Sequence, residues 1–224
     1  MSQIRRGRCL DVDAGTRPAV PRRRRHDDDV RQQPDPRREA CPVRVPLRTP
    51  RGLLGRLLTW YSVRTYGDVP DNGLALLHNR PVLWAVLAFE RRVATWDRLD
   101  PDLKVLAQAG SAEVIGCSWC MDFGYFAAHS EGLDVSKLHE VPRWRDSDVF
   151  DARERRVLEY SEAMSATPPA VTDEMAEALR ADLGDAAFVE LTMMVAVENE
   201  RSRFNSALGL TSQGFSDRCE LPAR

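Results

Sequence analysis

The sequence has no run of apolar residues long enough to cross a bilayer. A membrane-spanning helix needs about 18 to 20 consecutive apolar residues, and the most apolar short run, Pro81 to Phe89, ends at Glu90, Arg91 and Arg92. The N-terminus is charged but no apolar segment follows it, which argues against a secretory signal. We therefore expect a cytoplasmic protein with no membrane partner.

The sequence also lacks the regularly spaced cysteines of a secreted disulfide framework. Of its five cysteines, Cys9, Cys41 and Cys219 stand alone, whereas Cys117 and Cys120 are three residues apart. In a reducing compartment, an isolated Cys-x-x-Cys pair is typical of redox catalysis or of metal binding. The sequence therefore predicts that this pair is the functional site.

The first 48 residues differ in composition from the rest of the chain. The formal net charge of the whole chain is −2, yet residues 1–50 hold 13 Arg against 7 acidic residues and seven of the 14 prolines. Their apolar residues follow neither a helical nor a strand period, so no face can be buried. We expect residues 1–48 to form a disordered basic tail. A basic arm that binds nucleic acid or a membrane is the alternative, and the overall net charge argues against a nucleic-acid partner.

From Thr49 onward the apolar residues follow helical spacing. No segment alternates between apolar and polar residues in the manner of a strand, so we predict an all-α fold. A helical domain is expected over 49–215, followed by a flexible tail over 216–224. The expected helices include one beginning near residue 53 and others over 71–78, 81–96, 103–130, 151–164, 172–183 and 185–208.

The predicted helix over 103–130 carries both cysteines of the pair. At about 100° per residue, Glu113, Cys117, Cys120 and Gly124 fall on one face of a continuous helix. Two thiols in this arrangement can act as a nucleophile and its resolving partner. Glu113 can relay a proton, or its charge can raise the pKa of the thiols by repulsion. His129 falls about 180° from Cys120, so it is not expected to reach that thiol.

Two other interpretations of the pair remain. A structural zinc site takes four ligands, usually as two close pairs, and the only histidines that follow the cysteines closely, His129 and His139, are too far apart for that pattern. We therefore expect no metal and no cofactor. Buried cysteines can also serve only as small apolar side chains, in which case the pair has no chemical role.

Two stretches of the sequence carry a resemblance to a known family. They are Cys117-Ser-Trp-Cys120-Met-Asp122-Phe-Gly124, preceded by Ile115-Gly116, and the segment from Glu190-Leu-Thr to Asn199 with Arg203-Phe204-Asn205 after it. Over about residues 80 to 215, the chain resembles the carboxymuconolactone decarboxylase and alkylhydroperoxidase-D-like family. The resemblance implies an all-helical bundle, a homo-oligomer and thiol peroxidase chemistry. It implies that Cys120 attacks a hydroperoxide, that Cys117 closes the disulfide, and that an external dithiol reduces it.

The chain departs from the family pattern at two positions. Active members usually have a histidine four residues after the second cysteine and often a glutamate twelve residues before the first, where this chain has Gly124 and Val105. Two hypotheses follow. The chain is a dithiol hydroperoxidase or disulfide oxidoreductase in which Glu113 replaces the missing acid, or it is a non-catalytic redox sensor or binding protein that has lost the proton relay.

Overall fold

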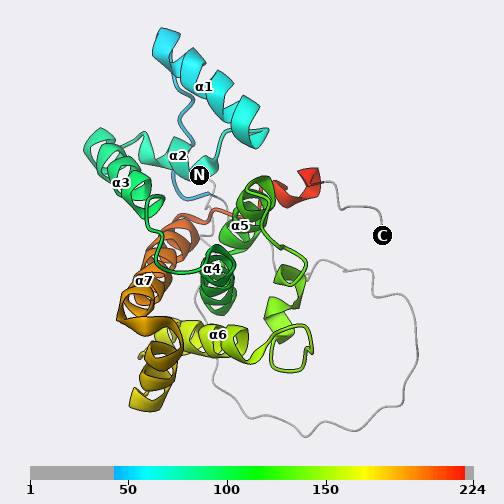
Figure 1. Ribbon diagram of the computed structural model, residues 1–224. Coiled ribbons are helices and arrows are strands. Elements are labelled where there is room, and N and C mark those ends of the chain that lie inside the picture. Colours follow the sequence, from blue (N-terminus) through cyan, green and yellow to red (C-terminus); the bar gives the residue numbers. More distant parts are fainter. Residues whose placement is uncertain (1–42, 220–224) are drawn as a thin grey trace, which may run out of the picture. The chain divides into compact units, whose positions relative to one another are not determined.

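The computed structural model describes residues 43–219, and all the regular secondary structure in that part of the chain is helical (Figure 1). The predicted all-α class is therefore confirmed. This part of the chain also contains two short 3₁₀ helices, η1 (Leu138–Arg143) and η2 (Ser216–Arg218), the second of which follows the last α-helix. The α-helices are α1 (Gly52–Tyr66), α2 (Asp71–Leu76), α3 (Arg80–Val93), α4 (Pro101–Ile115), α5 (Ser118–Ser130), α6 (Ala152–Ser165) and α7 (Asp173–Leu208).

Local capping residues explain where three of these helices begin. The Asp100 side chain accepts the backbone N–H of Asp102 at 2.9 Å, and Pro101 follows at the first helical position. Asp151 forms a reciprocal capping box with Glu154 at the start of α6, and Thr172 caps α7. Each such cap satisfies N–H groups that have no partner inside the helix and contributes about 1 kcal/mol.

The predicted continuous helix over 103–130 is wrong. The chain leaves α4 at Gly116, whose φ of 77° and ψ of 33° lie in the left-handed region, and Cys117 then begins α5 as its N-cap. Glycine adopts this conformation at little cost because it has no Cβ. The predicted break at Gly184 does occur as a bend inside α7, where Gly184 has φ 77° and ψ 162°.

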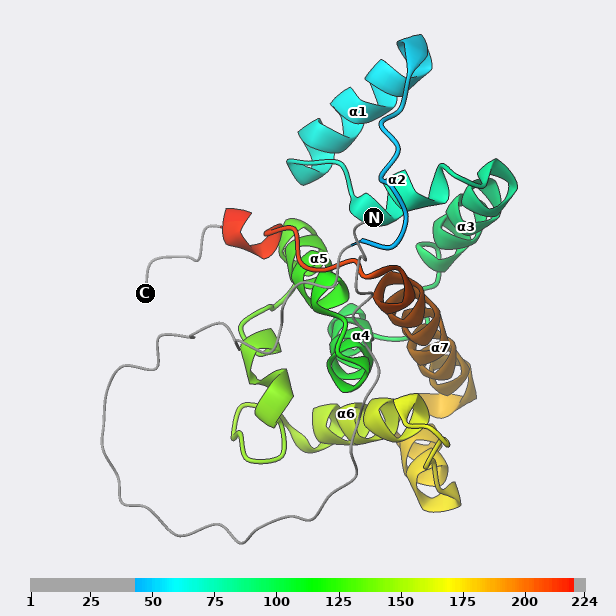
Figure 2. The same cartoon turned by 180° about the vertical axis from the view of Figure 1, so that it is seen from behind.

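Helix α4 lies at the centre of the helices that form the core. Both views show it flanked by α5, α6 and α7 (Figures 1 and 2). The core between them is apolar and fully buried, and includes Ala107 of α4, Val157 and Leu158 of α6 and Leu191 of α7. No helix in the described range is long and apolar enough to cross a membrane.

The segment before α1 packs against the helices. The backbone N–H of Arg44 donates to Leu208 O at 2.9 Å, and Pro46 O lies 2.6 Å from His78 Nε2. Residues 43–48 were predicted to belong to the disordered tail, so the boundary of the helical domain lies earlier than expected. Residues 1–42, which include the arginine run, lie outside the described part of the chain.

Asp122 holds the C-terminal segment against α5. The residue is 6% exposed. Its carboxylate accepts hydrogen bonds from the backbone N–H groups of Gln213, Phe215 and Ser216 and from the hydroxyls of Ser212 and Ser216, at 2.7–3.1 Å. Residues 216–219 are therefore bound to the domain, contrary to the predicted flexible tail, and residues 220–224 lie outside the described range. Burial by itself would raise the pKa of Asp122, but these hydrogen bonds outweigh it and lower the pKa.

We expect Asp122→Asn to lower the free energy of unfolding by about 3 kcal/mol at pH 7, because it weakens several charge-assisted hydrogen bonds at once. The pKa of Asp122 is lowered in the folded state. The contribution of its carboxylate to the free energy of unfolding is therefore complete above the pKa of the unfolded state, about 3.9, and is lost as the pH falls through the pKa of the folded state. Urea denaturation at neutral and acidic pH measures both effects.

Asp97→Asn is the control, because Asp97 pairs with Arg98 at the surface with 83% of its side chain exposed. It should change stability by no more than about 0.5 kcal/mol. Equal stabilities of the Asp122 variant and the parent at pH 7 would contradict the anchoring role.

Candidate redox site

The structure joins the two cysteines that the sequence singles out. Cys117 and Cys120 form a disulfide with their Cα atoms 5.3 Å apart. Both lie in the interior, with Cys117 2% exposed and Cys120 8% exposed. The described state is thus the oxidised form of a dithiol, and reduction would release two buried thiols that face each other.

The break at Gly116 determines the environment of Cys117. Because α4 ends there, Cys117 becomes the N-cap of α5, and its Sγ accepts the backbone N–H of Cys120 at 3.2 Å. The N-terminus of a helix carries partial positive charge, which stabilises a thiolate and lowers the pKa of a cysteine placed there. Cys117 is therefore well suited to hold negative charge when the disulfide is opened.

Asn205 of α7 contacts the second sulfur. Its Nδ2 donates to Cys120 Sγ at 3.4 Å, and the residue is 1% exposed. Its Oδ1 is buried and has no hydrogen-bond partner among the described residues. The sequence had placed Asn205 within the family resemblance but gave no sign of this contact, which joins residues 85 positions apart.

Aromatic side chains surround the pair. Trp119 stacks on Phe123 with ring centroids 5.0 Å apart, and Phe215 lies edge-on to Phe123 at 5.2 Å. Tyr66 at the end of α1 contacts Phe123 at 5.5 Å. The cysteines and these rings belong to one apolar cluster with Leu210. Such surroundings exclude water and strengthen every hydrogen bond to sulfur.

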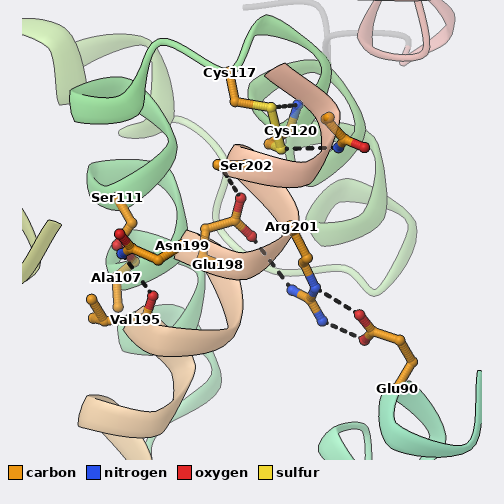
Figure 3. Close-up of polar contacts among 11 residues, drawn as sticks. Glu90, Ala107, Ser111, Cys117, Cys120, Val195, Glu198, Asn199, Arg201 and Ser202 are labelled. Carbon is orange, nitrogen blue, oxygen red and sulfur yellow. Dashed lines mark hydrogen bonds and ion pairs between the residues drawn. A yellow bond between two sulfur atoms is a disulfide. The ribbon is translucent and has the colours of Figure 1, made fainter. Parts of the chain in front are cut away.

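Polar side chains of α7 continue inward from the cysteines (Figure 3). Glu198 is 4% exposed, and its carboxylate accepts the hydroxyl of Ser202 at 2.8 Å. Arg201 lies 3.5 Å from the other oxygen of Glu198 and makes two shorter bonds, of 2.8 and 2.5 Å, to Glu90 of α3. Sequence reasoning missed Glu198 and Ser202, because only the fold brings α7 against α5.

The structure does not bring Glu113 onto a shared helix with the cysteines. Glu113 is exposed in the last turn of α4, before the break at Gly116. It lines a surface cavity of about 210 Å³ together with Trp144, Arg145 and Glu162. The helical-wheel argument that placed it beside the thiols is therefore wrong, and its catalytic role stays a prediction.

The two positions that depart from the family pattern have different surroundings. A Cβ added at Gly124 would meet no atom within 4 Å, so space for a side chain exists there. Val105 instead packs against the hydrophobic core of α4 and α6. Across residues 43–219, no three His, Cys, Asp or Glu side chains are close enough to hold a metal ion.

Comparison with known proteins places the chain among relatives of the same fold. The profile of the carboxymuconolactone decarboxylase family matches residues 80–163. The uncharacterized protein YnjA of Escherichia coli is 36% identical over 126 residues, which cover 56% of this chain and 68% of YnjA.

Two solved structures share the fold at lower identity. An alkylhydroperoxidase AhpD core from Ralstonia eutropha, an uncharacterized peroxidase-related protein, superposes with a TM-score of 0.68 at 17% identity, covering 81% of this chain and 99% of that one. A variant of the debrominase Bmp8 in complex with 2,3,4-tribromopyrrole superposes with a TM-score of 0.66 at 18% identity. The superposition covers 77% of this chain and 95% of the Bmp8 chain. The sequence match to YnjA, the family profile and the shared helical fold together show that the chain belongs to the carboxymuconolactone decarboxylase family.

Proposed function

We propose that the protein is a thiol-dependent hydroperoxidase that cycles Cys117 and Cys120 between dithiol and disulfide. The observation that carries this proposal is the buried disulfide itself, in which each sulfur receives an N–H donor, one from the start of α5 and one from Asn205. Donors of this kind stabilise the thiolate, which is the reactive form of cysteine. The aromatic surroundings favour an organic hydroperoxide as substrate.

The cycle begins at Cys120. Its thiolate attacks the terminal oxygen of the hydroperoxide, an S–O bond forms as the O–O bond breaks, and the alkoxide leaves as the alcohol after taking up a proton. Cys120 is then a sulfenic acid, oxidised by two electrons. Cys117 attacks its sulfur, the disulfide forms and water leaves. An external dithiol reduces the disulfide by exchange and becomes a disulfide itself.

A redox sensor or binding protein without turnover is the second candidate. Gly124 and Val105 stand where active members of the family carry proton-relay residues, and both cysteines are almost wholly buried. Such a protein would oxidise reversibly, but peroxide consumption in the presence of a dithiol would stay at background. Sustained turnover separates the two functions.

We also propose that the chain forms a homo-oligomer, as the family resemblance implies. Helices α1 and α3 carry large apolar side chains that the described chain leaves exposed, including Leu53 at 85% and Trp60 at 60%. Exposed apolar surface of this kind marks a contact with another protein. A second copy of the same chain is the partner that the resemblance favours.

Single substitutions test the order of the two cysteines. Cys120→Ser should reduce hydroperoxide consumption to background, because the attacking sulfur is gone. Cys117→Ser should also stop turnover with a dithiol such as dihydrolipoamide, but it should still consume one equivalent of hydroperoxide and leave a sulfenic acid on Cys120. Peroxide consumption and mass spectrometry of a trapped sulfenic acid measure the two effects. Wild-type rates in Cys120→Ser would contradict the proposal.

Asn205→Leu should raise the pKa of Cys120, because it removes the N–H that stabilises the thiolate. A hydrogen bond to a charged group contributes about 1.5 to 3 kcal/mol, which corresponds to a shift of about 1 to 2 pH units. The pH dependence of Cys120 alkylation in a Cys117→Ser background measures it. Asn199→Leu on the same helix is the control, since Asn199 binds Ser165 rather than sulfur. If Cys120 alkylation has the same pH midpoint in Asn205→Leu and in Asn199→Leu, Asn205 does not stabilise the Cys120 thiolate.

The double variant Leu57→Lys/Trp60→Lys should convert the oligomer to monomers, because two charges would replace apolar side chains one turn apart on α1. Light scattering after size exclusion gives the mass of each species. Val189→Lys is the control, as Val189 is an exposed apolar residue of α7. A monomeric parent protein, or an oligomer that survives the double substitution, would argue against a second copy on α1.

A further inference from the structure

A buried acid lies beside the dithiol and takes no part in the cycle described above. Glu198 stands on α7 and its Oε1 accepts the Ser202 hydroxyl at 2.8 Å. Ser202 is fully buried and Glu198 nearly so. A carboxyl group withdrawn from water in this way is costly to keep ionised unless a cation compensates it.

Among residues 43–219, the cation that contacts Glu198 is Arg201, which is already engaged by another acid. Arg201 binds Glu90 through two bonds, of 2.8 Å from Nε and 2.5 Å from Nη2. Its contact with Glu198 is a single one of 3.5 Å. If both carboxyls were ionised, the three groups would carry one uncompensated negative charge inside the protein. A proton held on Glu198 removes that charge.

The pKa of Glu198 agrees with this balance of charge. Burial raises it to about 7, in spite of Arg201 and the Ser202 hydroxyl, which lower it, while Glu90 raises it further. A group with this pKa can take up and release a proton near neutral pH, which an exposed glutamate with its ordinary value of about 4.3 does not do.

Glu198 lies on the face of α7 that contacts Cys120. Glu198, Ser202 and Asn205 are four and three residues apart, so they line one face of the helix. Asn205 touches Cys120 Sγ, and Ser202 lies one turn before it. Figure 3 shows Ser202 between the cysteine pair and the Glu198 carboxylate. A serine hydroxyl donates and accepts at the same time, so it can pass a proton along this line.

We propose that Glu198 exchanges a proton with the Cys120 thiol through the Ser202 hydroxyl. This use of the residue rests on the proposed hydroperoxidase function. Glu198 takes the proton of the Cys120 thiol, the thiolate forms the S–O bond as the O–O bond breaks, and the departing alkoxide receives that proton and becomes the alcohol. The hydrogen of the terminal peroxide oxygen stays on the sulfenic acid, so atoms and charge balance.

The other ionisable groups around Glu198 leave this role to it. Arg201 on α7 and Glu90 on α3 neutralise each other. Glu200 is exposed, and burial and the charge of Glu90 raise its pKa, but it lies two residues after Glu198 and so on another face of α7. Lys104 of α4 is paired with Glu190 at 2.6 Å. Glu113, which the sequence favoured as the relay, is exposed near the end of α4.

Alkylation of Cys120 by iodoacetamide, followed across the pH range in the full-length Cys117→Ser protein, tests this proton exchange. Peptide mass spectrometry separates Cys120 from the other cysteines. Because two coupled groups lose their protons in two steps, the parent should show one rise in rate near pH 7 and a second at higher pH. Glu198→Gln should leave a single rise at the higher pH, and Ser202→Ala should suppress the first rise while the acid remains in place.

Glu190→Gln is the matched control, a buried acid on the same helix whose partner is Lys104, and it should keep both rises. A first rise that persists in folded Glu198→Gln overturns the proposal, as does its loss in Glu113→Gln alone. If Glu198→Gln does not fold, Ser202→Ala decides in the same way. If the alkylation rate shows both rises but the wild-type protein does not turn over peroxide, the proton exchange stands and the proposed hydroperoxidase function is refuted.

Discussion

The positive φ of Gly116 is the constraint on which the redox site depends. By ending α4 one residue before the pair, it turns Cys117 into the N-cap of α5 and lets its sulfur accept the N–H of Cys120. An uninterrupted helix would satisfy that N–H with a backbone carbonyl and leave both sulfurs without help from a helix terminus. The same break leaves Glu113 on α4, a different helix from the cysteines, where its side chain is exposed.

Helix α7 supplies what the cysteine segment lacks. One face of this helix brings Asn205 to Cys120 Sγ and, within two further turns, the buried pair Ser202 and Glu198. Asp122 completes the enclosure from the other side, because its hydrogen bonds hold Phe215 and its neighbours against α5. The dithiol is thus enclosed by α7 and by the segment that follows it, both about 90 residues from the cysteines in sequence, and these leave a few directed polar groups at the sulfurs.

Local signals in the sequence predict much of this fold and little of the site. Asp151 and Thr172 indicate helix starts because a cap acts within three residues, and the Cys-x-x-Cys spacing places both sulfurs together without any knowledge of the fold. The break at Gly116 was missed, since a single glycine in an apolar segment is tolerated inside a helix and nothing nearby demands a left-handed residue. The contacts of Cys120 with Asn205, and of Asp122 with the segment after α7, join residues about 90 positions apart. Helical periodicity carries no information on such pairings.

We propose that the buried pair reduces a hydroperoxide by closing its own disulfide. The most direct measurement mixes the fully reduced protein with one equivalent of an organic hydroperoxide, without any reductant, and follows the alcohol formed and the mass of the protein. A working dithiol predicts one alcohol per chain and the loss of two hydrogens from the protein, located at Cys117 and Cys120. Unchanged hydroperoxide, or alcohol formed while both thiols stay reduced, would contradict it.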